Sequence, residues 1–315
     1  MKLQTQIPLK VAENTIDYNS KVFLMGSCFV ENIGEKLQYF KFQNLVNPFG
    51  IIFHPVAMEH LLDRVVKERF FTVDDIFYLN ERWQCFEVHS EMGNSSKEAF
   101  LDHLNTSLEA LKAFLQEASH VVITLGTAWG YRHMEQGKIV ANCHKVPQKC
   151  FQKELMEVNA LSLSLKRTTS LLLSLNPEIE IIFTVSPVRH IKDGFVENQL
   201  SKAHLIAAVH QIITGEKRLH CFPSYEIMMD ELRDYRFYAE DMLHPNETAV
   251  KYIWKKFQDV WIDHESLPIM KEVEKVQNGL QHRPFNRESE EYKKFQLKLQ
   301  QKIVYLSSTY PHIQF

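Results

Sequence analysis

A serine near the N-terminus has the sequence surroundings of a catalytic nucleophile. Ser27 follows Gly26, directly after a run of apolar residues. A serine hydroxyl becomes nucleophilic when a base takes its proton, and a tight turn between a strand and a helix exposes it. Free N–H groups of the helix expected from about Phe29 would favour an oxyanion beside Ser27. Two other interpretations stay open: Ser27 as a simple helix cap, and Cys28 as the nucleophile.

An aspartate and a histidine three positions apart lie near the other end of the chain. Asp241 and His244 belong to the segment AEDMLHPN at 239–246. Residues three apart share one side of a helical turn, so the carboxylate can hold one imidazole tautomer while the other nitrogen accepts a proton. Pro245 favours a loop at His244, before a helix at 246–260. The alternative is a surface pair whose Asp241 only favours the start of that helix.

The elements that must position these residues alternate between strands and helices. Short apolar runs at 21–25, 45–46, 120–125, 179–185 and 219–222 predict buried strands, and several run into Gly, Ser, Pro or Asn. Amphipathic spacing predicts helices at 30–40, 56–67, 97–118, 152–175 and 198–214. This alternation predicts an α/β fold, a three-layer α/β/α sandwich around a mainly parallel five-stranded sheet. Ligands of such sheets bind at the carboxyl ends of the strands, where these polar residues fall.

Two regions do not fit this alternation of strands and helices. Residues 71–95, rich in Phe, Tyr and Trp, predict an aromatic insertion, a hairpin or lid over the sheet edge. Residues 266–315 lose the strand signal, and 288–303 reads as a charged amphipathic helix. We therefore expect a catalytic domain at 1–265 and a helical C-terminal extension at 266–315 packed on it.

Composition excludes several classes of function. The chain has 315 residues, 45% hydrophobic and 24% charged, with a net charge of −3 and its charges interleaved, so nothing favours nucleic acid or an anionic membrane. No apolar run approaches the roughly 20 residues of a membrane span, and the N-terminus lacks a signal-peptide core. Five cysteines without a CxxC motif suit reduced thiols, and we expect a cytoplasmic protein. The sequence lacks HExxH, GxGxxG and GK[ST] motifs, so we expect no metal and no cofactor.

Taken together, the motifs resemble a known family. Gly-Ser after the first strand with Asp-x-x-His near the chain end resembles the SGNH/GDSL hydrolase superfamily. Within it, GSCF at 26–29 is similar to the signature of the bacterial GSCFA family, with Val30 in place of the final alanine. Over roughly residues 20–260 the resemblance also includes NPFGIIFHP at 47–55, TLGTAW at 124–129, NCHKVP at 142–147, SPVRH at 186–190, ENQLSK at 197–202 and PSYE at 223–226.

The resemblance implies an SGNH-like fold and a serine esterase with the triad Ser27, Asp241 and His244. It places the oxyanion beside the N–H groups of Ser27 and Gly50. Gly50 matches the glycine in the second of the sequence blocks that characterise the superfamily. The third block has Gly126-Thr127-Ala128 where the superfamily has an asparagine. Thr127 is one candidate to replace that asparagine, and Asn47 and Asn142 are the others.

Further polar residues follow strand ends and are candidate substrate ligands. We place Asn47, His54, Asn142, His144, Arg189 and His190 in this set. An ordinary loop role is equally compatible with His144, and for Arg189 a solvated position is favoured over a ligand role. Aromatic residues near Asp241 would stack on sugar rings or pack the core; these are Tyr225, Tyr235, Phe237 and Tyr238.

The expected activity is hydrolysis or transfer of a small acyl group from an ester through acyl-Ser27. An acylated sugar is the leading substrate class, by analogy with related SGNH families. The alternative is a non-catalytic SGNH-like module that binds a ligand at the sheet edge. The sequence sets neither the acyl group nor the oligomeric state.

Overall fold

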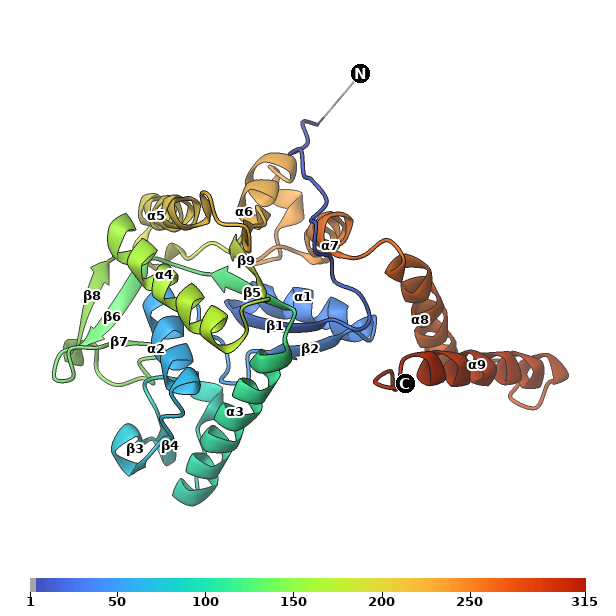
Figure 1. Ribbon diagram of the computed structural model, residues 1–315, viewed down its shortest axis with the longest axis horizontal. Helices are drawn as coiled ribbons and strands as arrows, with labels where there is room; N and C mark the ends of the chain where they lie inside the picture. The colour runs from blue at the N-terminus through green and yellow to red at the C-terminus, as the bar shows by residue number, and fades with distance from the viewer. Residues whose placement is uncertain (1–3) are drawn as a thin grey trace.

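Five parallel strands form the centre of the molecule (Figure 1). The computed structural model describes residues 4–315. The strand order is β10-β9-β5-β1-β2, and every pairing in this sheet is parallel. The strands are β1 (Lys21–Gly26), β2 (Gln43–Val46), β5 (His120–Leu125), β9 (Glu180–Val185) and β10 (Leu219–Cys221). The predicted mainly parallel five-stranded sheet is confirmed.

Helices cover both faces of this sheet, because side chains along each strand alternate between two apolar cores. Phe23 of β1 packs in one core, and its neighbours Val22 and Leu24 pack in the other. The first core is covered by α2 (Pro55–Val66), α3 (Lys97–Glu117), α4 (Val158–Leu175) and α5 (Phe195–Ile213). The second is covered by α1 (Cys28–Tyr39) and α7 (Glu247–Trp261). The fold is therefore the predicted three-layer α/β/α sandwich.

A second, antiparallel sheet accounts for one wrong boundary. We expected a helix over 152–175, but α4 begins at Val158, and Phe151–Leu155 forms strand β8. This strand pairs with β6 (Trp129–His133), which also pairs with β7 (Ile139–Val140). Residues 151–155 are extended because they pair with β6, some twenty residues earlier in the chain. The spacing of apolar residues within 152–175 does not reveal this contact.

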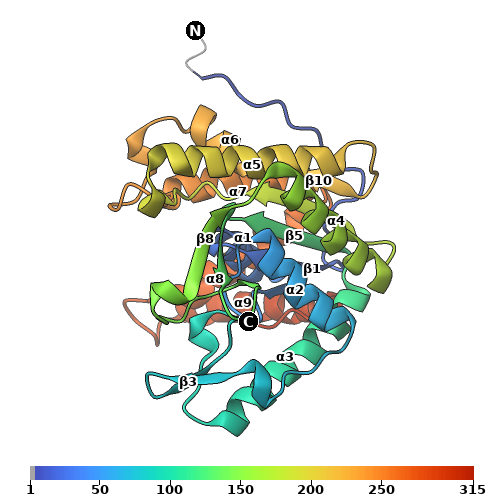
Figure 2. The same cartoon turned by 90° about the vertical axis from the view of Figure 1, so that its left-hand side faces the viewer.

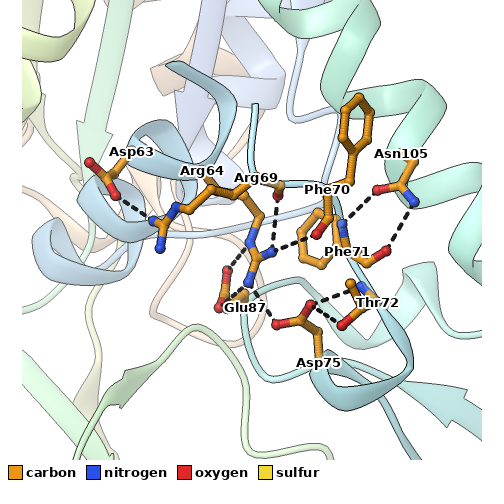
Figure 3. A network of polar contacts seen from close by, with 9 residues as sticks. All are labelled: Asp63, Arg64, Arg69, Phe70, Phe71, Thr72, Asp75, Glu87 and Asn105. Carbon is orange, nitrogen blue, oxygen red and sulfur yellow. Dashed lines mark hydrogen bonds and ion pairs between the residues drawn. The ribbon is translucent and has the colours of Figure 1, made fainter. Parts of the chain in front are cut away.

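The aromatic insertion contains the hairpin β3 (Phe77–Leu79) and β4 (Arg82–Gln84), as expected. Arg64 of α2 holds the insertion against the domain. Its buried guanidinium lies over the ring of Phe71 and bonds to the carboxylates of Asp75 and Glu87 (Figure 3). A bidentate arginine of this kind fixes the orientation of both partners.

The C-terminal extension consists of α8 (Ser266–Gln281) and α9 (Glu290–Thr309), which Figure 1 places on the opposite side of the molecule from β3 and β4. Leu306 and Ile313 are buried in the same core as α1 and α7. Tyr310 packs on Tyr18, with ring centroids 5.1 Å apart. The extension thus completes the second core.

Shorter elements connect these parts. Figure 2 shows α2 and α4 side by side on the face of the sheet that the first core covers. The remaining elements are α6 (Ser224–Glu226), a π-helical segment at Ile227–Glu231, and 3-10 turns at Val73–Asp75, Ser90–Met92, Gln148–Cys150, Ile191–Asp193 and Tyr235–Phe237. Among residues 4–315, no helix combines the length and apolar character that crossing a membrane requires.

Candidate active site

Ser27 lies at a turn that only glycine can begin. Strand β1 ends at Gly26, whose φ is 145° and where a Cβ atom would lie 2.2 Å from the Thr124 carbonyl oxygen. Ser27 then becomes the N-cap of α1, its Oγ accepting the Phe29 N–H at 3.4 Å. The residue is 1% exposed. Capping is thus a real role of Ser27, and it leaves the hydroxyl proton unused.

Asn47 joins the loop after β2 to this turn. Its Oδ1 accepts the Gly26 N–H at 2.9 Å, and its Nδ2 donates to Glu31 of α1 at 3.2 Å. The backbone of Asn47 has a φ of 41°, a left-handed conformation that asparagine tolerates. Asn47 therefore ties the backbone just before Ser27 to the side chain of Glu31 on the helix that follows it.

Asp241 and His244 form the expected pair. Nδ1 of His244 donates to Oδ2 of Asp241 at 2.6 Å. Oδ1 of Asp241 accepts the N–H groups of Leu243 at 2.9 Å and His244 at 3.0 Å. These backbone hydrogen bonds, with that of the imidazole, lower the pKa of Asp241 to about 2. The carboxylate is therefore ionised at neutral pH and fixes the tautomer with a free lone pair on Nε2.

The segment that carries this pair is a turn and not the helical turn that its spacing suggested. Met242 has a φ of 59°, and the Asp241 carboxylate replaces the backbone hydrogen bonds that a helix would supply. His244 lies in the loop before α7, as expected, with Asn246 as the N-cap of that helix. The His244 side chain is 48% exposed and that of Asp241 45%. The imidazole is accessible to a substrate.

A backbone contact ties this loop to the carboxyl end of β9. The Arg189 N–H donates to the Leu243 carbonyl oxygen at 3.2 Å. The Arg189 guanidinium lies 4.2 Å from the ring centre of Tyr238, so it is not simply solvated. With Tyr235 and others, Arg189 lines a pocket of about 230 Å³. Among residues 4–315, no hydrogen bond joins Ser27 to His244.

His190 follows Arg189 and is largely enclosed. Its N–H donates to Asn198 Oδ1 at 2.8 Å, and its ring lies against Phe53, with centroids 5.7 Å apart. Burial, reinforced by the charges of Lys202 and His244, lowers the pKa of His190 to about 3. His190 is therefore a neutral imidazole, held beside Phe53 and the start of α5.

The three expected oxyanion donors are all engaged in internal hydrogen bonds. The Ser27 N–H donates to the Thr124 carbonyl oxygen at 3.0 Å, and the Gly50 N–H to that of Asn47 at 2.8 Å. The Thr127 hydroxyl bonds to Ser201 Oγ at 2.9 Å and accepts the Trp129 N–H at 3.1 Å. An oxyanion role for these groups stays a prediction, and it requires a rearrangement of the turn.

Three of the expected substrate ligands belong to other surroundings. His144 donates from Nε2 to the Cys85 carbonyl oxygen at 2.6 Å and packs on the rings of the aromatic insertion. Asn142 Oδ1 accepts the His144 N–H at 2.8 Å. His54 is the N-cap of α2, its Nδ1 accepting the Val56 N–H at 3.3 Å. All three thus have local structural roles, and the loop interpretation of His144 describes its contacts.

Sequence reasoning gave no role to the buried polar residues at the start of α5. Asn198, Ser201 and Lys202 face the core, and we call them the polar face of α5. Asn198 binds the His190 N–H, Ser201 binds the Ala128 N–H at 2.7 Å, and Lys202 binds the carbonyl oxygens of Gly126 and Ser186. The signal in the sequence was their spacing, which places them on the apolar side of the helix beside Leu205.

The arrangement defines a class of protein. It is a doubly wound α/β protein with a buried serine after β1 and an accessible Asp-His pair tied to the end of β9. In the described part of the chain, no group of three or more His, Cys, Asp or Glu residues is arranged to hold a metal ion.

The chain belongs to the GSCFA family. The family's sequence model matches residues 21–257, and that of the GSCFA domain protein, C-terminal domain, matches residues 273–315. No curated protein matches the sequence.

Several solved structures resemble the chain at low identity. A carbohydrate esterase family 3 from Talaromyces cellulolyticus is 8% identical with a TM-score of 0.36, over 80% of this chain and 98% of its own. An acetyl esterase mutant with acetate ion is 10% identical with a TM-score of 0.33, over 81% and 99%. An acetyl xylan esterase from the rumen bacterium Butyrivibrio proteoclasticus is 11% identical with a TM-score of 0.41, over 85% and 66%.

Proposed function

We propose that the protein is a serine acyl hydrolase that cleaves a small acyl ester through acyl-Ser27. The observation that carries this proposal is the imidazole of His244, fixed by a 2.6 Å bond to an ionised Asp241 and open to a substrate. The resemblance to SGNH hydrolases, in which a serine after the first strand meets such a pair, supports the same assignment.

The reaction follows from these groups. Nε2 of His244 takes the proton of Ser27 as Oγ attacks the ester carbonyl carbon, and the carbonyl oxygen becomes an oxyanion. The C–O bond to the alcohol then breaks, and His244 returns the proton to the leaving oxygen. Water repeats the sequence on acyl-Ser27, releasing the acid and the free serine. Another alcohol in place of water gives acyl transfer.

Cys28 is a poorer nucleophile than its position suggests. Burial raises the pKa of the thiol, and the charge of Glu31 raises it further. Reactive cysteines have lowered pKa values, because the thiolate is the attacking species. This favours Ser27 as the acylated residue.

An acylated carbohydrate is the substrate class that we favour. Tyr235 is exposed, and with Tyr238 and Arg189 it lines the pocket of about 230 Å³ that borders the His244 loop. Aromatic rings and an arginine are suited to the apolar face and the hydroxyl groups of a sugar.

Kinetics with p-nitrophenyl acetate test the proposal. Because Ser27 forms the covalent intermediate, we expect Ser27→Ala to lower kcat by roughly 10³-fold or more while the protein stays folded. Cys28→Ala is the matched control one residue away, and it should keep most of the activity. Full activity in Ser27→Ala with loss in Cys28→Ala would assign the nucleophile to the thiol.

The second candidate function is a non-catalytic module that binds an acylated sugar. The N–H groups of Ser27 and Gly50 favour it, because both already donate to backbone carbonyl oxygens and are not free to bind an oxyanion. Saturable binding of an acetylated sugar by calorimetry, with no acetate released on long incubation, would support the module and contradict the hydrolase.

A further inference from the structure

Lys202 is a buried lysine without a carboxylate partner in the described structure. Its side chain is 0% exposed, and lysine is almost never fully buried unless it is paired. Nζ donates to the carbonyl oxygens of Gly126 at 2.7 Å and Ser186 at 2.8 Å. Carbonyl dipoles compensate an ammonium only in part, so this position carries a cost that a neutral side chain would avoid.

The two carbonyl groups lie at the edge of the sheet where the candidate site is. Gly126 directly follows β5, and Ser186 directly follows β9. The Ser186 N–H donates to the Leu125 carbonyl oxygen at 2.8 Å, so the two strand ends are already paired. Lys202 therefore binds the first residue of each of two loops, one leading to Thr127 and the other to Arg189 and His190.

The charge of Lys202 also acts on the groups beside Ser27. Burial raises the pKa of Cys28, the residue after Ser27, and lowers that of His190; the charge of Lys202 opposes the first shift and adds to the second. The ammonium also lies 5.8 Å from the ring centre of Tyr225. Burial lowers the pKa of Lys202 to about 7, and raises the pKa of Cys28. With a neutral thiol and a neutral His190 around it, the protonated form of Lys202 is the positively charged group of this part of the site, and a pKa near 7 lets the side chain gain or lose its proton close to neutral pH.

We propose that Lys202 is a positioning residue of the acyl-transfer site, holding the loops after β5 and β9 together while its ammonium stabilises the negative charge that develops beside Ser27. This inference rests on the proposed hydrolase function. An ammonium in a dry interior acts over a longer range than one in water, so it needs no contact with the substrate, and an anion forming beside Ser27 would in turn favour the protonated form of Lys202. Such a charge would supply part of what the third-block asparagine supplies in the wider superfamily.

The first test replaces the charge with a side chain of similar length. In Lys202→Met, we expect kcat for p-nitrophenyl acetate and the rate of fluorophosphonate labelling of Ser27 to fall by roughly 10²-fold, with KM within about threefold of wild type. Lys112→Met is the matched control, because Lys112 lies on α3 in an ion pair with Glu68. A purely structural lysine would change the thermal midpoint without this separation of kcat from KM.

The second test uses the wild-type chain, so it does not depend on how the variant folds. Phenylboronic acid forms an anionic tetrahedral boronate with an activated serine. We expect the pKa of Lys202, followed by NMR of its labelled side chain, to rise by at least one pH unit when the boronate forms, and not to change in Ser27→Ala. An unchanged pKa in the wild-type adduct would overturn the inference.

The outcomes separate the two proposals. If Ser27 reacts and Lys202→Met reacts as fast as wild type, Lys202 is only a structural clamp and the hydrolase proposal stands. If folded wild-type protein reacts with neither the fluorophosphonate nor phenylboronic acid, the hydrolase proposal and the role of Lys202 fail together.

Discussion

At the scale of single residues, a short spacing in the sequence becomes an oriented acid-base pair. Asp241 is held by two backbone N–H groups, so it cannot turn away from His244, and its low pKa keeps it ionised. This pairing could be predicted from the three-residue spacing, although the turn that produces it could not. Lys202 could not be assigned, because a lysine in an amphipathic helix ordinarily lies at the surface.

Neutralising Asp241 tests this orientation. In Asp241→Asn the amide keeps the shape of the carboxylate but no longer stabilises the imidazolium, and we expect kcat for p-nitrophenyl acetate to fall by roughly 10²- to 10⁴-fold. Glu240→Gln is the control, since Glu240 is the exposed neighbour of Asp241. Equal activities in the two variants would mean that Asp241 only shapes the loop.

At the scale of elements, helix ends and strand ends determine where the polar side chains go. Ser27 caps α1, His54 caps α2, and the polar face of α5 binds the loops that follow β5 and β9. The strands and most helices could be predicted because apolar periodicity reports burial. Strand β8 could not, since its pairing with β6 is a tertiary contact. His144 was placed in the site because it follows a short apolar run, which in fact belongs to the second sheet.

Burial of His54 at the cap of α2 predicts a pH dependence of stability. Burial lowers the pKa of His54 from 6.5 to about 4. Between pH 6.5 and pH 4, His54 is therefore protonated in the unfolded chain but neutral in the folded chain. The free energy of unfolding should therefore fall as the pH decreases from 6.5 to 4, by about 3 kcal/mol from this residue. Urea unfolding across that range should show a shallower decline in His54→Asn, which retains a capping side chain. An identical decline in both proteins would contradict the assignment.

At the scale of the whole molecule, the C-terminal extension completes a core that begins at the N-terminus. Val22 of β1, helices α1 and α7, and Leu306 of α9 share one apolar cluster. The helical extension could be predicted from the sequence, because the strand signal ends before it. Residues 273–315 also match a family model of their own. The residues of α9 that pack inward could not be predicted, because very few side chains of this helix are buried.

Two leucines of α9 test this packing. Leu306 is 1% exposed and Leu297 is 66% exposed. Leu306→Ala should lower the free energy of unfolding by about 2–5 kcal/mol, because it leaves a cavity in the core, whereas Leu297→Ala should change it by less than about 0.5 kcal/mol. Denaturant titration at constant pH measures both. Similar losses in the two variants would show that α9 packs on a different face.

Covalent labelling of the folded protein tests the central claim most directly. After exposure to a fluorophosphonate, peptide mass spectrometry should find one adduct, on Ser27. The adduct should be retained in Cys28→Ala, form much more slowly in Asp241→Asn and be absent from Ser27→Ala. An adduct that persists in Ser27→Ala, or none on protein that is fully folded, would contradict the assignment of Ser27 as a nucleophile activated by His244.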